Sequence, residues 1–347
     1  SAIASGLIDR VKASLDAAGV EHAELGGVRP NPEIGLVRKG VALCKEQDVD
    51  WVLAVGGGSV IDSAKAIAVG AHYEGDVWDF FETKRQTNDV LPIAVVLTIP
   101  AAGSESSDSC VITKEEGLFK RSCAGEALIP RFAILNPAFT CTLPPYQTAC
   151  GATDILAHLM ERYFTRVDHV DLTDRLLEAT MRTVINYTPL ALERPDDYHI
   201  RAELMWAGTV AHNNLLDTGR IGDWASHQIE HELSALYDIA HGAGLAIVFP
   251  AWMKYVYRAD MSRFVQFAVR VFGVDLAFAE PEQIVLQGIR RLEAYLRSIG
   301  MPVRLGEAGI DDSRLLEMAE KCCAKGPQGQ FQKLHTRDVH AIYELAL

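Results

Sequence analysis

The sequence predicts an α/β N-terminal domain with a parallel sheet, followed by an all-α C-terminal domain. Within the first 143 residues, apolar runs of strand length alternate with amphipathic segments of helical period. From about Pro144 onward only helical periods remain. The chain has 347 residues, which is long for one hydrophobic core. We therefore expect a domain at residues 1–143 and a second at residues 144–347.

The expected N-terminal elements alternate as a parallel sheet with crossover helices requires. They are a helix at 6–19, a short strand at 20–25, a helix at 30–47, strands at 50–55 and 91–100 around a helix at 59–71, a hairpin at 109–113 and 119–124, and a last strand at 131–137. The run at 50–55 is nearly all apolar, as in a strand buried on both faces.

The second half of the chain shows helical amphipathic periods throughout. Helices are expected in 143–165, 171–187, 201–216, 263–272 and 281–299. Near His241 the segment YDIAHG indicates that one helix ends and another begins.

Charge and cysteine usage exclude several classes of protein. The net charge is −13, so the chain should repel nucleic-acid backbones and anionic membrane surfaces. Its seven cysteines are odd in number and form no CxxC pair, which favours reduced thiols over a disulfide framework. No apolar run is long enough to span a membrane, and no signal pattern opens the chain. We expect a soluble cytoplasmic protein that binds neither nucleic acid nor membrane.

Two loops have the composition of a nucleotide site. In AVGGGSVIDSAKAIA, a predicted strand runs into Gly56, Gly57 and Gly58 before a helix begins near Ser59. Glycines allow close backbone approach, and a helix N-terminus favours anions such as a pyrophosphate. In TIPAAGSES, small and hydroxyl residues follow the next strand. Each loop alone is equally compatible with a tight turn or a serine-rich surface loop; together they reinforce each other.

Five side chains have the spacing and chemistry of candidate metal ligands. Asp154 and His158 are four apart in a helical segment, and so are His227 and His231, with His241 following. HQIEH is not the HExxH of zinc peptidases, and any one of these histidines alone is compatible with a structural role. One carboxylate with two or three imidazoles supplies the ligands of a divalent transition metal, either iron(II) or zinc.

These motifs together resemble one family. GGGSVIDSAKAIA, TIPAAGSES, NPAFTCTLPPYQTACGATDILAH and HQIEHELSALYDIAHG are similar, in order and spacing, to the iron-containing alcohol dehydrogenases, and most to their butanol dehydrogenase and broad-range aldehyde reductase branch. The resemblance implies a Rossmann-like domain, a helical domain, and a metal in the cleft between them, the dehydroquinate synthase-like architecture. It implies an NAD(P)-linked enzyme for short to medium primary alcohols and aldehydes.

The resemblance also assigns residues. The metal, Fe2+ with Zn2+ as the alternative, would be held by Asp154, His158, His227 and His241, and would act as a Lewis acid on the substrate oxygen. NAD or NADP would contact Asn31, Gly57, Gly58, Ser59, Asp62, Thr98 and Lys120. Two residues are expected to be catalytic: Asp62 at the nicotinamide end, and His231 as a proton relay or as a hydrogen bond that orients a ligand. Trp224, Tyr237 and Phe249 are candidate pocket residues.

The start of the chain, its oligomeric state and other enzyme classes raise further expectations. The first strand and glycine-rich turn of the family have no counterpart beyond Ser1, so we expect a trimmed chain and cannot predict NAD against NADP. Kinship implies a homodimer. A dehydroquinate-synthase-like lyase and a non-catalytic relic compete with the dehydrogenase. A metallohydrolase would need Glu230 or Glu232 as its base.

Overall fold

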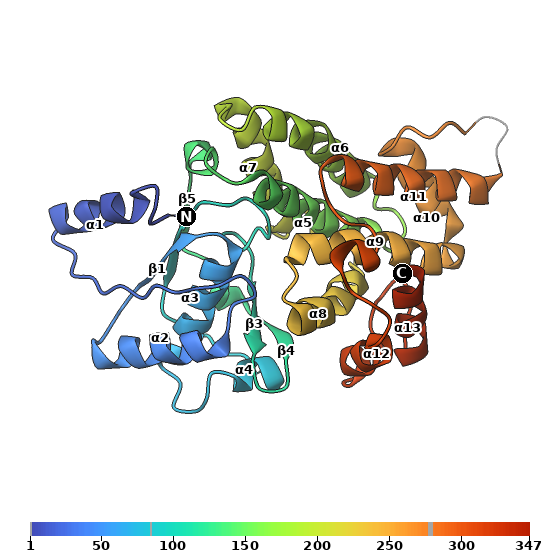
Figure 1. Ribbon diagram of the computed structural model, residues 1–347. Coiled ribbons are helices and arrows are strands. Elements are labelled where there is room, and N and C mark those ends of the chain that lie inside the picture. Colours follow the sequence, from blue (N-terminus) through green and yellow to red (C-terminus); the bar gives the residue numbers. More distant parts are fainter. Residues whose placement is uncertain (1, 84, 277–279) are drawn as a thin grey trace. The chain divides into compact units, whose positions relative to one another are not determined.

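The computed structural model describes residues 2–83, 85–276 and 280–347, which form two compact units. The first unit comprises Ser1–Pro100 and Ser104–Leu143, and the second comprises Ala101–Gly103 and Pro144–Leu347. In Figure 1 the first unit is blue to green, and the second continues to red.

A three-stranded parallel sheet organises the first unit. Its strands are β1 (Val52–Gly56), β2 (Ile93–Leu97) and β5 (Phe132–Leu135), in the order β1-β2-β5. Gly56 pairs with Leu97, and Leu97 with Leu135, so the three strands end at one edge of the sheet. Helix α3 (Gly58–Ala71) provides the crossover between β1 and β2. The expected α/β class is confirmed.

Burial differs between the strands. The central strand β2 is buried along its whole length, as predicted. The prediction that 50–55 is buried on both faces is wrong, because Leu53 is 36% exposed and β1 pairs only with β2 among the described residues. On the other side of β2, Phe132 of β5 is 51% exposed. A purely apolar run therefore did not distinguish an edge strand from a central one.

The remaining elements of the first unit surround its core. They are α1 (Leu7–Ala17), α2 (Ile34–Glu46), α4 (Asp79–Glu82), the antiparallel hairpin β3 (Ser109–Lys114) and β4 (Phe119–Ala124), and the 3-10 turns η1 (Glu126–Leu128) and η2 (Pro137–Thr140). Helices α2 and α3 pack together, and α3 packs on β3. The prediction of a strand at 20–25 is wrong, because this segment has no regular structure. Its residues are exposed, so no buried face holds it in a sheet.

The second unit is helical, as predicted, and contains nine described α-helices. They are α5 (Pro145–Tyr163), α6 (Asp171–Glu193), α7 (Tyr198–His212), α8 (Ala225–Tyr237), α9 (His241–Val256), α10 (Met261–Arg270), α11 (Pro281–Ser298), α12 (Leu315–Cys323) and α13 (Thr336–Leu345), with 3-10 turns η3 (Leu215–Asp217), η4 (Tyr257–Ala259) and η5 (Gly306–Ala308). The β-structure described here is an isolated bridge between Gln328 and Leu334.

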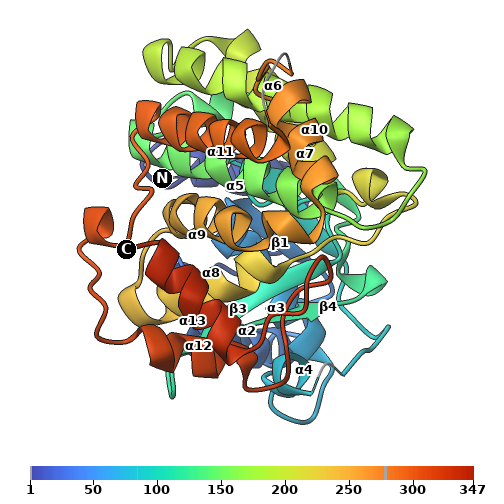
Figure 2. The same ribbon diagram turned by 90° about the vertical axis from the view of Figure 1, so that its right-hand side faces the viewer.

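Helices α5 and α9 lie side by side at the centre of this unit. Helices α6, α7, α10 and α11 lie on one side of this pair, and α8, α12 and α13 on the other (Figures 1 and 2). The buried aromatic core includes Phe164, Trp252 and Phe264. None of the described helices combines the length and hydropathy needed to cross a membrane.

Candidate functional site

Helix α5 presents Asp154 and His158 from one face. The helical repeat places residues four apart above one another, and the Oδ1 atom of Asp154 lies 3.1 Å from Nδ1 of His158. Each residue is only 5% exposed. A carboxylate in such a dry position is costly unless a cation or several donors face it.

Helices α8 and α9 supply the other two histidines, and a short break between the helices places them. Helix α8 carries His227 and ends at Tyr237, Asp238 adopts the left-handed conformation with φ 50°, and α9 begins at His241. The next residue, Gly242, touches α5: a Cβ atom there would lie 2.1 Å from the carbonyl oxygen of Cys150. Glycine therefore lets the first turn of α9 approach α5, which brings His241 to Asp154.

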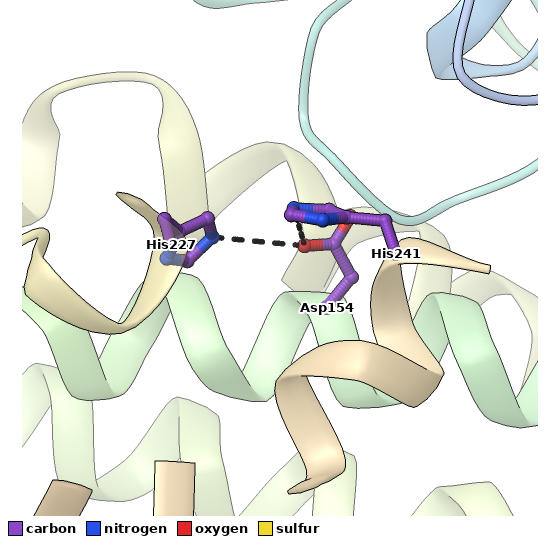
Figure 3. Close-up of side chains that lie close together, drawn as sticks. All are labelled: Asp154, His227 and His241. Carbon is purple, nitrogen blue, oxygen red and sulfur yellow. Dashed lines mark ion pairs between the residues drawn. The ribbon is translucent and has the colours of Figure 1, made fainter. Parts of the chain in front are cut away.

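Asp154, His227 and His241 converge on one point, and we call them the Asp154 cluster. Oδ1 of Asp154 lies 3.9 Å from Nε2 of His227 and 3.8 Å from Nε2 of His241. Figure 3 shows both imidazoles turned toward this oxygen, with a dashed line from each. These separations suit ligands that each lie about 2.0–2.2 Å from a shared ion.

Two atoms at the centre of the cluster make no internal hydrogen bond, although Nδ1 of His158 lies 3.1 Å from Oδ1 of Asp154. Within the described part of the chain, Asp154 Oδ1 and His227 Nε2 are buried and have no hydrogen-bond partner. Buried polar atoms are nearly always satisfied in folded proteins, so two unsatisfied acceptors facing each other indicate a missing ligand. A divalent cation meets this requirement, because it bonds to carboxylate oxygen and imidazole nitrogen alike.

Each of the three imidazoles is anchored through Nδ1. Nδ1 of His227 lies 2.7 Å from Oε1 of Glu161, Nδ1 of His241 bonds Oε2 of Glu230, and Nδ1 of His158 lies 2.8 Å from the carbonyl oxygen of Asp154. An ionised carboxylate or a carbonyl can only accept, so Nδ1 carries the proton. Every Nε2 atom is thereby left with its lone pair, the form that binds a metal.

The anchoring carboxylates are themselves held in place. Glu161, on α5, also accepts the main-chain N–H groups of Trp224 and His227, at 2.6 and 3.0 Å. Glu230 also accepts the hydroxyl of Ser234, and a Cβ atom at Gly244 would lie 2.5 Å from its Oε1 atom. The sequence reasoning missed Glu161 and considered Glu230 only as a hydrolase base. Glu161 follows Asp154 by seven positions, a spacing that places both on one helix face.

The electrostatics of the cluster match the protonation states that ligands require. Burial lowers the pKa of His227 well below its ordinary value, and the neighbouring His158 and His241 lower it further. Burial raises the pKa of Asp154, but the imidazoles of His158, His241 and His227 outweigh it and hold that pKa well below its usual range. A neutral His227 and an ionised Asp154 are the forms that bind a metal.

His158 lies beside the Asp154 cluster rather than within its tightest set of atoms. Its ring centroid is 4.6 Å from that of His227 and 4.4 Å from that of His212. Trp224, a candidate pocket residue, lies next to both, with its ring 5.3 Å from His227 and 5.9 Å from His158. The rings of His212 and Trp224 thus pack against His158, and that of Trp224 also packs against His227.

The other two candidate pocket residues lie elsewhere. Phe249 is 1% exposed and packs on Phe164 and Trp252, so the structure places it in the core, where an aromatic residue of the central helix α9 finds its neighbours. Tyr237 is the last residue of α8, and its pKa is raised by burial, with Arg314 acting in the opposite direction.

His231 also lies close to the cluster. Ligand-type atoms of Glu230, His231 and His241 lie within 4.8 Å of one another, and the ring of His231 is 5.7 Å from that of His241. His231 is 4% exposed. An imidazole here can orient His241 or pass a proton.

In the first unit, four of the residues predicted to bind the nucleotide lie at the carboxyl edge of the sheet. Gly57 caps α3, and Gly58 and Ser59 are its first residues. Thr98 follows β2, and its N–H donates to the carbonyl of Gly56 at 3.0 Å, which joins the two predicted loops. The first N–H groups of a helix have no intrahelical partner and favour an anion.

Two other predicted nucleotide residues, Lys120 and Asn31, lie in hydrogen-bond contact with each other. Nζ of Lys120 donates to Oδ1 of Asn31 at 3.0 Å, although the residues are far apart in the chain. Lys120 is 4% exposed and lies on β4, opposite Thr113.

Asp62 forms part of a saturated polar arrangement with Lys65, which sequence reasoning missed. Oδ1 of Asp62 accepts from the Ser104 hydroxyl at 2.7 Å and Oδ2 from the Val111 N–H at 2.9 Å. Nζ of Lys65 donates to the carbonyls of Ser107 and Ser109, at 2.7 and 2.9 Å. Burial raises the pKa of Asp62 and lowers that of Lys65. The Asp62–Lys65 pair thus binds the loop that follows β2 to α3.

Comparison with known proteins identifies related sequences over almost the whole chain. The family model described as "Iron-containing alcohol dehydrogenase" matches residues 1–137. The model described as "Fe-containing alcohol dehydrogenase family, C-terminal" matches residues 148–347. A probable NADH-dependent butanol dehydrogenase 1 of Bacillus subtilis is 45% identical over 343 residues, 99% of this chain and 89% of the relative. The NADPH-dependent aldehyde reductase YqhD of Escherichia coli is 34% identical over 348 residues, 99% of this chain and 89% of its own length.

A solved structure has the same architecture. The NADH-dependent butanol dehydrogenase A of Thermotoga maritima superimposes with a TM-score of 0.96 at 42% identity, covering 99% of this chain and 88% of that one.

Proposed function

The chain belongs to the iron-containing alcohol dehydrogenase family, and we propose that Asp154, His158, His227 and His241 hold its iron ion. It is an oxidoreductase, a metal-dependent alcohol dehydrogenase or aldehyde reductase that uses NAD(P)H. Neither a lyase nor a non-catalytic relic is favoured by these relatives.

One observation supports the ligand assignment above all others. The unsatisfied atoms Asp154 Oδ1 and His227 Nε2 face each other inside the second unit, and Nε2 of His241 lies beside them. An iron ion bound there supplies Lewis-acid activation of the substrate oxygen. The ionised Asp154 compensates part of the positive charge, and Glu161 and Glu230 hold the imidazoles of His227 and His241 in the binding tautomer.

The nucleotide assignment rests on the geometry of the first unit. We propose that Gly57, Gly58 and Ser59 bind the pyrophosphate of NAD(P) through their main chain at the start of α3. Thr98, Lys120 and Asn31 would contact the remainder of the dinucleotide. Because Asp62 accepts hydrogen bonds from Ser104 and Val111, we expect it to position the loop beside the nicotinamide end.

For substrates, we propose short to medium primary alcohols and their aldehydes. The names of the relatives support this choice, since they include butanol dehydrogenases and an aldehyde reductase. Four relatives described as NADH-dependent are 40–45% identical to the chain, and the NADPH-dependent one is 34% identical, which favours NADH. Reduction of butanal should therefore have a higher kcat/KM with NADH than with NADPH.

The metal assignment is tested with His241→Ala. Protein purified without air should lose its iron and its butanal reductase activity together, while NADH binding, measured by fluorescence, persists. His199→Ala, at an exposed position of α7, is the matched control and should retain both iron and activity. Full iron content in the folded His241→Ala protein would refute the assignment.

His231 is proposed as the group that relays the substrate proton. A His231→Ala protein should keep its iron but turn over more slowly and with an altered pH profile of kcat. If iron content falls in step with the rate, His231 instead orients His241.

A homodimer and a cytoplasmic location complete the proposal. Kinship supports the dimer, and seven free thiols support a reducing compartment. Sedimentation equilibrium tests the dimer.

A further inference from the structure

Two cysteines face each other across the β3–β4 hairpin of the first unit, which also carries Lys120. Cys110 on β3 pairs directly with Cys123 on β4, and the pairs on either side keep the same register. Cys110 is 1% and Cys123 5% exposed, so both thiols project from the buried face of the hairpin.

The two thiols also interact. A hydrogen bond with Cys123 raises the pKa of Cys110 well above its ordinary value, and the same contact lowers the pKa of Cys123. Directly opposed residues in an antiparallel pair have Cα atoms about 4.5–5.5 Å apart. This spacing lies within the range of about 4.4–6.8 Å that a disulfide requires. The hairpin therefore presents a pre-aligned pair of thiols.

We propose that Cys110 and Cys123 form a reversible disulfide when the protein meets a small-molecule disulfide. The sulfur of Cys123 attacks one sulfur of the small disulfide and displaces one thiol, which leaves a mixed disulfide. The sulfur of Cys110 then attacks Cys123 and displaces the second thiol. Two protein thiols are oxidised, one small disulfide is reduced to two thiols, and the two protons pass to the departing thiolates.

The other described cysteines are arranged differently, although Cys322 and Cys323 also share a hydrogen bond. Cys44 lies in the core on α2, and Cys150 contacts the sulfur of Met301 at 3.8 Å. Cys322 and Cys323 are neighbours on α12, where consecutive side chains diverge by about 100° around the helix. Among the described cysteines, only Cys110 and Cys123 lie opposite each other on two paired strands.

The test uses the full-length, iron-loaded protein without air, with oxidised glutathione as the probe. All seven cysteines are free thiols in the structure, so the thiol count after denaturation should fall by two, from seven to five. Peptide mass mapping should show Cys110 linked to Cys123, and dithiothreitol should restore all seven thiols.

Three variants sharpen the result. Cys110→Ser should stop at a mixed disulfide between glutathione and Cys123, whereas Cys44→Ser, the control in the same core, should still form the cross-link. Should Cys110→Ser fail to fold, mapping of the unsubstituted protein and of Cys123→Ser decides the matter. An unchanged thiol count, or glutathione adducts without a Cys110–Cys123 cross-link, would overturn the proposal.

Discussion

One aspartate of each unit, Asp62 in the first and Asp154 in the second, can be compared by what surrounds its carboxylate. Asp62 accepts two hydrogen bonds and faces Lys65, whose ammonium group donates to the carbonyls of Ser107 and Ser109. Asp154 instead leaves Oδ1 without a hydrogen bond, opposite His227 Nε2, which also has none. A carboxylate whose oxygens all accept hydrogen bonds thus stabilises the fold, whereas one with an oxygen that accepts none is suited to bind a ligand.

The largest expected effect concerns the saturated Asp62–Lys65 pair. Asp62→Ala removes the acceptor of the Ser104 hydroxyl and of the Val111 N–H, so we expect the free energy of unfolding to fall by about 1–3 kcal/mol for each donor left unsatisfied. Urea denaturation measures this change, and Asp16→Ala on the exposed face of α1 provides the control. Iron content should remain unchanged. If Asp62→Ala instead lost iron without a change in the free energy of unfolding, Asp62 would act like Asp154, and the distinction between a structural and a ligand-binding carboxylate would be wrong.

The second effect concerns the anchors of the Asp154 cluster. Glu161→Gln keeps an acceptor for Nδ1 of His227 but removes the charge, and we expect iron affinity to fall about 10–100-fold. Competition with a chelator measures the affinity. The matched control is Glu178→Gln, because Glu178 is equally buried but bonds Tyr163 instead. Equal losses of affinity in both variants would mean that the effect is only structural.

The smallest effect is a pH dependence of stability at Asp223, an intermediate case. Its carboxylate accepts from the main-chain N–H groups of Gln330 and Phe331, and burial followed by repulsion from Glu161 raises its pKa from 3.8 to about 7. Between these values the folded state binds more protons than the unfolded state. Its contribution to the free energy of unfolding is therefore greatest below the lower value and falls as pH rises to about 7.

Asp223→Asn retains an oxygen for both N–H groups and removes the titration. Denaturation of metal-free protein at pH 5 and at pH 7.5 should show a smaller difference in unfolding free energy than in the unsubstituted protein. An identical difference would assign the pH dependence to other groups.

Local patterns predicted much of the fold. The run at 91–100 contains the fully buried β2, and KEEGL correctly separated the strands of the hairpin. Patterns failed where burial depends on neighbours: Leu53 is apolar but lies on an edge strand, and the segment at 20–25 has strand-like composition without a sheet to join. Periodicity describes one element, whereas exposure depends on what packs against it.

The site shows the same limit. The four-residue spacing of Asp154 and His158 follows from helical geometry, but the approach of His241 depends on Gly242 crossing α5 at Cys150. No spacing rule encodes that contact. The sequence does not show that Glu161 anchors His227. Its partners are the ring and the main-chain N–H of His227, which lies far along the chain on α8. The ligand set itself was implied by resemblance and stays a prediction.

X-ray absorption spectroscopy at the iron edge of the loaded protein tests the ligand set most directly. We expect one iron per chain, surrounded by carboxylate oxygen and imidazole nitrogen at about 2.0–2.2 Å, with the scattering pattern of three imidazoles. Sulfur at about 2.3 Å, or fewer than two imidazoles around the iron, would contradict it.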